Sequence, residues 1–425
     1  MSFLQIILIV YLALSLLALL LYIPKIKCWV YGFKQQKKLT NPKQNKLAII
    51  VPAREESACI GKLLKSINRQ TYPSALFDTF IVVARDDDPT IKIASNTLKN
   101  VDVWVEKNQT CKAEAMDSLF KHIFETKGNI YDGYIIVDAD SYLDDNYLTE
   151  MNNAMSTNAD VIISKKKVLN WESDNKKLRT LFANLSGLTF TGLDTMGNKY
   201  KSDHNFALTI SGNGMMLSKR YVEKFNGFPF RSICEDVEAG INAMLYDFKE
   251  LYYEHAILYT EEPITHKEYN KRRYRWLKGY LSNNQTYNAK LYNKTFKQGK
   301  IVRSNFKYLF ELVPVYFFVG VTVVALLTFL FSGIVLACLH SPLTKQAFLF
   351  ALLIAVIIYA VLAVFNLITV LEEDSKKLKL GEKLAVIFIG PIITFEYVII
   401  FFKTINKKFT VDWDPIERIT LDETN

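Results

Sequence analysis

Four long apolar runs divide this 425-residue chain into a short amino-terminal part, a large polar middle and a carboxyl-terminal third. The first run, residues 3–23, carries no charge and is long enough to cross the hydrocarbon core of a bilayer as a helix. Nothing basic precedes it and several lysines follow it, so we expect an uncleaved anchor and not a secretory signal peptide. The positive-inside rule then places the chain from Lys25 onward in the cytoplasm.

The carboxyl-terminal third contains the other three apolar runs, at residues 313–339, 347–371 and 384–402. The first two are long enough to span a bilayer, whereas Gly390-Pro391 interrupts the third, which also contains Glu396. Three spans would leave the tail outside, yet the lysines after the last run favour the inside. A full span and a re-entrant segment both stay open for the third run.

The composition agrees with a membrane component, because half of the residues are hydrophobic. A net charge of +9 fits phosphorylated substrates or an anionic membrane face. The five cysteines are scattered without C-x-x-C spacing, so neither a disulfide scaffold nor a zinc site is indicated. The basic residues cluster beside membrane segments and form no aromatic-interleaved stripe, so we expect no nucleic-acid partner.

The polar middle alternates short apolar runs with amphipathic stretches, which predicts a mostly parallel sheet flanked by helices. The expected strands cover residues 46–51, 80–84, 101–105, 134–137 and 207–210, and Ser57 is expected to cap the helix after the first. The predicted division is a membrane helix at 1–24, the soluble domain at 45–290, an interfacial segment at 291–312, a membrane region at 313–408 and a polar tail at 409–425.

The strand at residues 134–137 runs directly into two carboxylates, Asp138 and Asp140. The carboxyl edge of an open α/β sheet is where ligands bind. Carboxylates one residue apart can hold a divalent cation, and Mg²⁺ is typically bound by one or two carboxylates and the phosphates of its substrate. Two solvated aspartates at a strand end are the simpler alternative.

Polar residues follow the other expected strands at the same edge. Pro52-Ala-Arg-Glu-Glu56 follows the first strand, Arg85-Asp-Asp-Asp88 the second, and Lys112 opens a helix after the third. Because parallel strands end at one edge of a sheet, these side chains are expected to gather there. Ordinary charged loops are the alternative.

Three later segments complete the pattern. Ser211-Gly-Asn-Gly214 permits a close backbone approach to a ligand, or forms a simple bulge. Glu235 and Asp236 open an amphipathic helix, where they could also act as helix caps. Arg272 and Arg275 share one helical face beside Trp276, in a segment that could equally be a solvated or membrane-facing basic helix.

In this order the motifs resemble those of the membrane-integrated family 2 glycosyltransferases, such as cellulose, hyaluronan, chitin and poly-N-acetylglucosamine synthases, and above all the exopolysaccharide type. The resemblance covers residues 45–280 and extends to the flanking apolar runs. Three features depart from the usual pattern: Arg272 replaces a glutamine, Cys111 replaces a glycine, and Asp86, Asp87 and Asp88 compete for one aspartate position.

The resemblance implies an α/β, GT-A (Rossmann-like) cytoplasmic domain inserted between one amino-terminal and about three carboxyl-terminal transmembrane helices. It implies inverting transfer from a UDP-sugar, with GlcNAc favoured over glucose, to a growing β-linked polysaccharide that is extruded through the plasma membrane. Mg²⁺ or Mn²⁺ is the expected cofactor, and an accessory subunit stays open. Single transfer to a lipid-linked acceptor is the main alternative, ahead of a glycoside hydrolase or a transporter.

The resemblance also assigns roles to individual residues. Asp236 is the expected general base, and Glu235 helps to position the site. Asp140 and Asp138 are the expected metal ligands. The nucleotide sugar is expected to contact Pro52, Ala53, Glu55, Asp86, Lys112 and Asp138, and the pyrophosphate and acceptor to contact Gly212, Arg272, Arg275 and Trp276. Apart from the resemblance, an ionisable residue inside an apolar run is usually functional or paired, so Glu396 could line a sugar path or equally sit at a kink near the interface.

Overall fold

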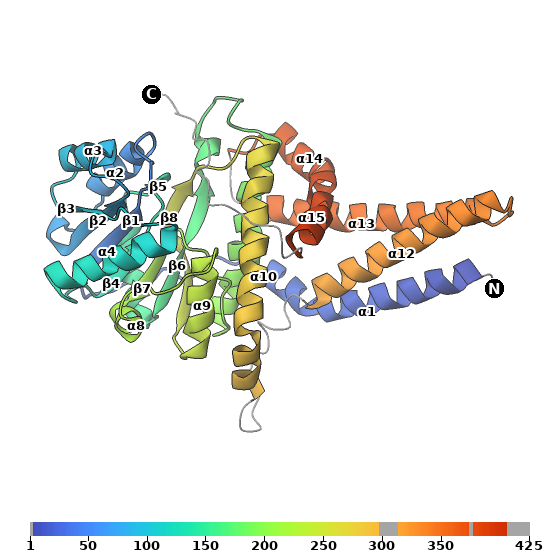
Figure 1. Ribbon diagram of the computed structural model, residues 1–425, viewed down its shortest axis with the longest axis horizontal. Helices are drawn as coiled ribbons and strands as arrows, with labels where there is room; N and C mark the ends of the chain where they lie inside the picture. Colours follow the sequence, from blue (N-terminus) through green and yellow to red (C-terminus); the bar gives the residue numbers. More distant parts are fainter. Residues whose placement is uncertain (1–2, 297–312, 374–376, 406–425) are drawn as a thin grey trace.

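The computed structural model describes residues 3–296, 313–373 and 377–405. A mixed sheet with helices on both faces forms one end of the molecule, and long helices extend from it side by side (Figure 1). The strands are β1 Leu47–Pro52, β2 Phe77–Val83, β3 Val101–Val105, β4 Gly133–Ile136, β5 Ser141–Leu143, β6 Val161–Val168, β7 Met215–Ser218 and β8 Glu250–Thr260.

The helices of the domain are α2 Ile60–Asn68, α3 Pro89–Thr97, α4 Lys112–Lys127, α5 Tyr147–Ala154, α6 Leu181–Phe190, α7 Lys199–Asp203, α8 Lys219–Phe225, α9 Glu235–Leu245 and α10 His266–Phe296. A π-helical segment, η4 Thr191–Asn198, joins α6 to α7, and short 3₁₀ turns lie at η1 Ser74–Leu76, η2 Met155–Thr157 and η3 Leu169–Glu172. The helices outside the domain are α1 Phe3–Gly32, α12 Val313–Cys338, α13 Thr344–Glu372, α14 Leu380–Phe388 and α15 Gly390–Ile405.

The sheet has the order β3-β2-β1-β4-β7-β6-β8-β5. The first four strands are parallel, β7 is antiparallel to both of its neighbours, and β6 and β8 pair in parallel with an irregularity after Ser164. The carboxyl ends of β1, β2, β3 and β4 therefore meet at one edge, as the sequence predicted.

The central strands read as unbroken apolar runs because both of their faces are buried. On β1, Leu47, Ile49 and Val51 pack under α2, α3 and α5, whereas Ala48 and Ile50 pack under α4, α8 and α9. Complete burial of an aliphatic side chain stabilises the fold by roughly 1.5–3 kcal/mol, so these strands hold the edge rigidly.

Two local predictions are wrong. Ser57 does not cap the first helix of the domain: α2 begins at Ile60 after a turn, and Cys59 occupies the N-cap without a side-chain hydrogen bond. Residues 207–210 form no strand, because the backbone amides of Leu208 and Thr209 bond to the side chains of Glu250 and Asn198 instead of to a neighbouring strand.

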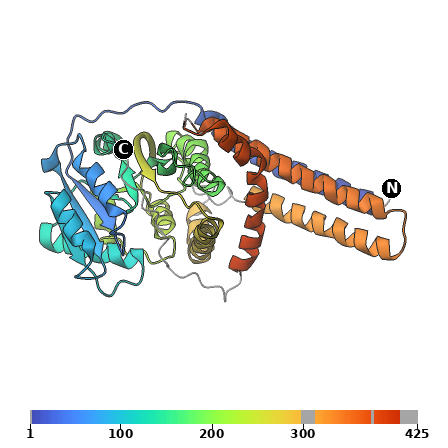
Figure 2. The ribbon, with the colours of Figure 1, turned by 90° about the horizontal axis from the view of Figure 1, so that it is seen from above.

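In the described part of the chain, α13 and residues 320–338 of α12 are long and apolar enough to cross a bilayer. A third candidate is the pair α14 and α15, bent by 43° at its break, and α15 runs across the direction of α12 and α13 (Figure 2). The apolar part of α1, Phe3–Leu17, is shorter, and it packs against α12 and α13 through Leu4 and Tyr11.

The long helix α10 lies between the sheet domain and the apolar helices (Figure 1). It runs through residue 290, so the predicted boundary between the soluble domain and an interfacial segment falls inside one helix. The rest of that segment, residues 297–312, and the polar tail at 409–425 lie outside the described residues.

Candidate active site

Lys112 connects the strand end that carries Asp138-Ala-Asp140 (the D-A-D motif) to the helix start that carries Glu235-Asp236 (the E-D motif). It is the first residue of α4, and its Nζ lies 2.6 Å from Asp138 Oδ1 and 3.6 Å from Glu235 Oε1. Burial alone would lower the pKa of Lys112, but Asp138 and Glu235 outweigh it and the pKa is raised. A permanently charged ammonium therefore sits between two predicted site carboxylates.

Glu235 and Asp236 open α9, and their environments differ. Burial and the nearby Asp236 raise the pKa of Glu235 to about 6, although Lys112 acts in the opposite direction. Asp236 is held by two backbone donors: Gly212 N–H donates to Oδ2 at 2.7 Å and Val237 N–H donates to Oδ1 at 2.8 Å. Because a carboxylate has about four lone-pair positions, Asp236 can still accept a proton from a ligand.

The loop Ser211–Gly214 (the S-G-N-G motif) bonds to the residues of both acidic motifs, D-A-D and E-D. While Gly212 holds Asp236, the side-chain oxygen of Asn213 accepts the backbone N–H of Asp138 at 3.0 Å, and its amide group donates to Ser141 Oγ at 2.9 Å. Gly214 has φ +74°, and a Cβ there would lie 2.0 Å from Leu258. Only glycine fits that position.

The segment Arg272–Trp276, with Arg275 before the tryptophan (the R-x-x-R-W motif), lies on α10, but its first arginine is already paired. Arg272 Nη1 donates to Glu262 Oε2 at 2.5 Å, and Glu262 is almost fully buried. The ring of Trp276 packs edge-on against Phe190 at 5.9 Å. Arg272 is thus oriented by a buried carboxylate, and one guanidinium nitrogen is used for that contact.

α10 reaches the E-D helix through a close contact one turn after Trp276. A Cβ on Gly279 would lie 2.4 Å from Cys234 Sγ and 2.9 Å from Cys234 N, and Asn283 donates to the carbonyl of Cys234 at 3.0 Å. Cys234 immediately precedes Glu235, and its buried thiol has a raised pKa, which the charge of Arg275 moderates. This contact sets the distance between α10 and Asp236.

The residues after β1 and β2 lie on the same edge, with less direct contact to the carboxylates. Ala53 N–H extends the pairing of β1 by donating to Val82 O at 2.9 Å, directly after Pro52. Glu55 adopts φ +58°, an uncommon conformation for a residue with a side chain, and Arg85 lies 3.5 Å from it. Such outliers concentrate at functional sites.

The three aspartates after β2 are distinguished by their partners. Asp88 is buried and caps α3 by accepting the backbone N–H of Thr90 at 2.9 Å. Asp87 is exposed and pairs with Arg85 at 3.2 Å, and Asp86 is exposed and pairs with Lys107. Asp88 is therefore structural, which leaves Asp86 and Asp87 for a ligand.

Asp138 and Asp140 are the oxygen ligands expected for a divalent cation. Among the residues that the structure describes, no group of three or more His, Cys, Asp or Glu side chains is arranged to hold a metal. Asp138 and Asp140 are two half-buried carboxylates, and Mg²⁺ commonly needs only one or two when substrate phosphates complete its shell. The pair fits a hard cation that arrives with its nucleotide.

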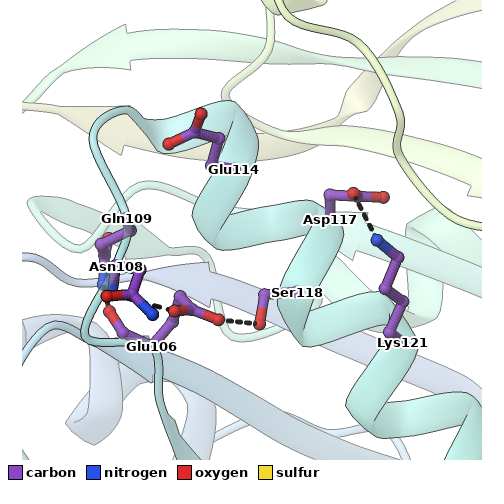
Figure 3. Close-up of a pocket in the computed structure, with 7 residues that line it drawn as sticks. All are labelled: Glu106, Asn108, Gln109, Glu114, Asp117, Ser118 and Lys121. Atoms are coloured by element: carbon purple, nitrogen blue, oxygen red, sulfur yellow. Dashed lines mark hydrogen bonds and ion pairs between the residues drawn. The ribbon is translucent and has the colours of Figure 1, made fainter.

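A pocket of about 390 Å³ lies beside α4. Its lining side chains bond to one another, for example Ser118 to Glu106 and Lys121 to Asp117 (Figure 3). The lining residues are Glu106, Asn108, Gln109, Glu114, Asp117, Ser118 and Lys121. None of the predicted site residues is among them.

Asn213, Glu262 and Gly279 were not predicted. Asn213 lies within the S-G-N-G motif, so the motif itself was the available signal. Glu262 and Gly279 act through contacts with Arg272 and Cys234 that no local pattern indicates.

A sequence profile of the family described as "Glycosyltransferase like family 2" matches residues 42–279, more than half of the chain. The chain belongs to glycosyltransferase family 2. It is 23% identical over 240 residues to "Probable glycosyltransferase YdaM" of Bacillus subtilis (strain 168), a match that covers 55% of each protein. The chain thus spans about half the length of this curated relative.

The fold is also similar to the solved structure of mannosyltransferase PcManGT from Pyrobaculum calidifontis, which contains GDP-Man and Mn²⁺. The TM-score is 0.53 at 17% identity, over 83% of this chain and 98% of that chain. This glycosyltransferase therefore has the predicted α/β, GT-A-like mixed sheet, followed by two long apolar helices.

Proposed function

We propose that this protein transfers a sugar with inversion from a UDP-sugar to a growing β-linked polysaccharide at the cytoplasmic face of the plasma membrane, and that it extrudes the chain. The main support is a set of contacts among three motifs. Lys112 pairs with both the D-A-D and the E-D motif, and the S-G-N-G loop bonds to both through Asn213 and Gly212. These motifs lie far apart in sequence, and one edge of the sheet brings them together.

The donor half of the reaction needs groups that neutralise a departing nucleoside diphosphate. Asp138 and Asp140 would hold Mg²⁺ or Mn²⁺, which would supply a Lewis acid for the pyrophosphate. Arg275 adds a planar cation suited to phosphate oxygens, and Arg272 adds the nitrogens not used by Glu262. Asp86 and Glu55 lie at the strand ends where the nucleotide is expected.

The acceptor half needs a base for the attacking hydroxyl. Asp236 is the better candidate of the two adjacent carboxylates, because backbone amides hold both of its oxygens in place. Glu235, with a pKa raised to about 6 by burial, contacts Lys112 and orients the site. Trp276 offers an aromatic ring on which the terminal sugar of the acceptor can pack.

One observation favours a second candidate, transfer of a single sugar to a lipid-linked acceptor. The helices α1, α12 and α13 pack directly on one another through apolar side chains such as Tyr11, Phe329 and Ala351. Helices packed in this way present apolar side chains, which suit a lipid better than a hydrated sugar chain. Extrusion would then require an additional subunit or a second copy.

The test is a screen of nucleotide sugars on purified full-length protein in lipid. Release of the nucleoside diphosphate would be measured for UDP-GlcNAc, UDP-glucose, UDP-glucuronic acid, UDP-galactose and GDP-mannose, with Mn²⁺ and with a chelator. We expect metal-dependent release from a UDP-sugar, and labelled product longer than a few sugars. Single-sugar lipid products would favour the second candidate, and metal-independent release would contradict the role of Asp138 and Asp140.

A further inference from the structure

One face of α10 is bonded to α15, on the membrane side of the molecule. His266, Asn270 and Arg273 are spaced at i, i+4 and i+7 along α10 and so share a face. On α15 their partners are the adjacent residues Glu396 and Tyr397. We call these five residues the α10–α15 clasp.

The first half of the clasp is formed by Glu396. His266 Nε2 lies 2.6 Å from Glu396 Oε2, and the side-chain amide of Asn270 donates to the same oxygen at 3.1 Å. The sequence left two roles open for this carboxylate, lining a sugar path and sitting at a kink near the interface. In the structure it faces α10 and holds two of its side chains.

The second half is formed by Arg273, which is buried. Its Nη1 donates to the Tyr397 hydroxyl at 2.8 Å, and its guanidinium lies between the rings of Tyr269 at 3.8 Å and Tyr397 at 4.9 Å. A cation held between two rings and a hydroxyl has a single defined position. Arg273 therefore fixes the register of α10 against α15.

Arg273 also bonds to Thr189, the residue next to the aromatic pair Phe190 and Trp276. Its Nη2 donates to Thr189 Oγ1 at 3.3 Å, and the next residue, Phe190, packs on Trp276. Arg272 precedes Arg273, and Trp276 follows one turn later on the same continuous helix. Any shift of Arg273 would therefore move Trp276 relative to Asp236, whereas the guanidinium of Arg272 is held separately by Glu262.

We propose that α15 is a positioning element for the acceptor: the clasp sets the place of Trp276 relative to the base, so that the membrane segment controls acceptor binding. This inference rests on the proposed glycosyl transfer. Lys112 belongs to the sheet edge, where it pairs with Asp138 and Glu235, and Arg272 is held by Glu262. A loosened clasp should therefore weaken acceptor binding and leave donor binding intact.

The experiment compares Tyr397→Phe, Arg273→Lys and the double variant with wild type, as full-length protein in lipid. Tyr397→Phe keeps the ring and removes only the hydroxyl. Tyr359→Phe is the matched control, because its hydroxyl donates at 2.8 Å to the carbonyl of Phe388, away from α10. The acceptor KM, the donor KM and the Kd of the nucleoside diphosphate would be measured for each protein.

We expect the acceptor KM to rise about 10- to 100-fold in the Arg273 and Tyr397 variants, the loss expected for a hydrogen bond to a charged group. The donor KM and nucleotide Kd should stay unchanged, the control should match wild type, and the double variant should lose no more than the worse single variant. An unchanged acceptor KM, or a parallel loss of donor and acceptor binding, would overturn the inference. Wild-type protein without any nucleotide-sugar turnover would instead refute the proposed function, and the inference with it.

Discussion

Gly279→Ala should separate α10 from the start of α9 and so disturb the site without touching a reacting group. The new Cβ would meet Cys234 Sγ at 2.4 Å and Cys234 N at 2.9 Å. To reach ordinary contact at 3.4–4 Å from the backbone nitrogen, α10 must retreat by roughly 0.5–1 Å. The backbone of Cys234 cannot rotate away, because the next residues begin α9.

This displacement has two expected costs. Overpacking of this kind destabilises a fold by about 1–3 kcal/mol, partly offset by the ~1 kcal/mol that alanine gains over glycine in a helix. A misplacement of about 1 Å between reacting groups costs roughly 10²-fold in rate. We therefore expect turnover to fall about 100-fold while the melting temperature drops only modestly.

The assay is nucleotide-sugar turnover at saturating donor, together with thermal unfolding of the same preparation. Gly61→Ala is the control, because a Cβ on this α2 residue would meet no atom within 4 Å. It makes the same change in helix propensity without the clash. Wild-type turnover in a folded Gly279→Ala protein would refute the argument that the α9–α10 distance sets the geometry of the site.

Three further predictions follow from single contacts. Lys112→Met removes the cation between Asp138 and Glu235, so the pKa of Glu235 should rise further above about 6. The acid limb of the pH–rate profile should then move to higher pH. An unmoved acid limb would contradict the influence of Lys112 on Glu235. Burial raises the pKa of Glu250 to about 8, so its stabilising contribution is present at low pH and is lost as pH rises through about 8. Because the ordinary pKa of a glutamate is about 4.5, the loss takes place between about pH 4.5 and 8, and Glu250→Gln should flatten the fall in melting temperature over that range. Gly214→Ala combines φ +74° with a 2.0 Å clash and should lower the free energy of unfolding by about 2–5 kcal/mol in a denaturant titration, which an unchanged transition would contradict.

The sequence predicted those parts of the fold and site that depend on local patterns. Apolar runs followed by polar residues located β1, β3 and β4 and placed Asp138 at a strand end. Lys112 and Glu235 each begin a helix as expected. These features can be predicted from local sequence alone. Strands buried on both faces appear as short apolar runs, amphipathic segments alternate apolar with polar residues, and certain residue types are preferred where a helix begins.

The missed features depend on contacts between distant segments. The sequence of residues 207–210 is typical of a strand. In the structure, the backbone amides in this segment donate instead to the side chains of Glu250 and Asn198. The pairing of Arg272 with the buried Glu262 and the close approach of Gly279 to Cys234 have the same origin. A one-dimensional pattern contains no information on such tertiary partners.

The most direct test of the central claim compares Asp236→Asn with wild type for transfer rate and for nucleotide binding. General-base catalysis typically contributes ~10²–10⁴-fold, which is about 3–5 kcal/mol of transition-state stabilisation. We predict that transfer falls by that factor while the Kd of the nucleoside diphosphate is unchanged, and that Glu235→Gln has the smaller effect on rate. Asp236→Asn protein that transfers sugar at the wild-type rate would contradict the assignment of Asp236 as the base, and with it this account of the site.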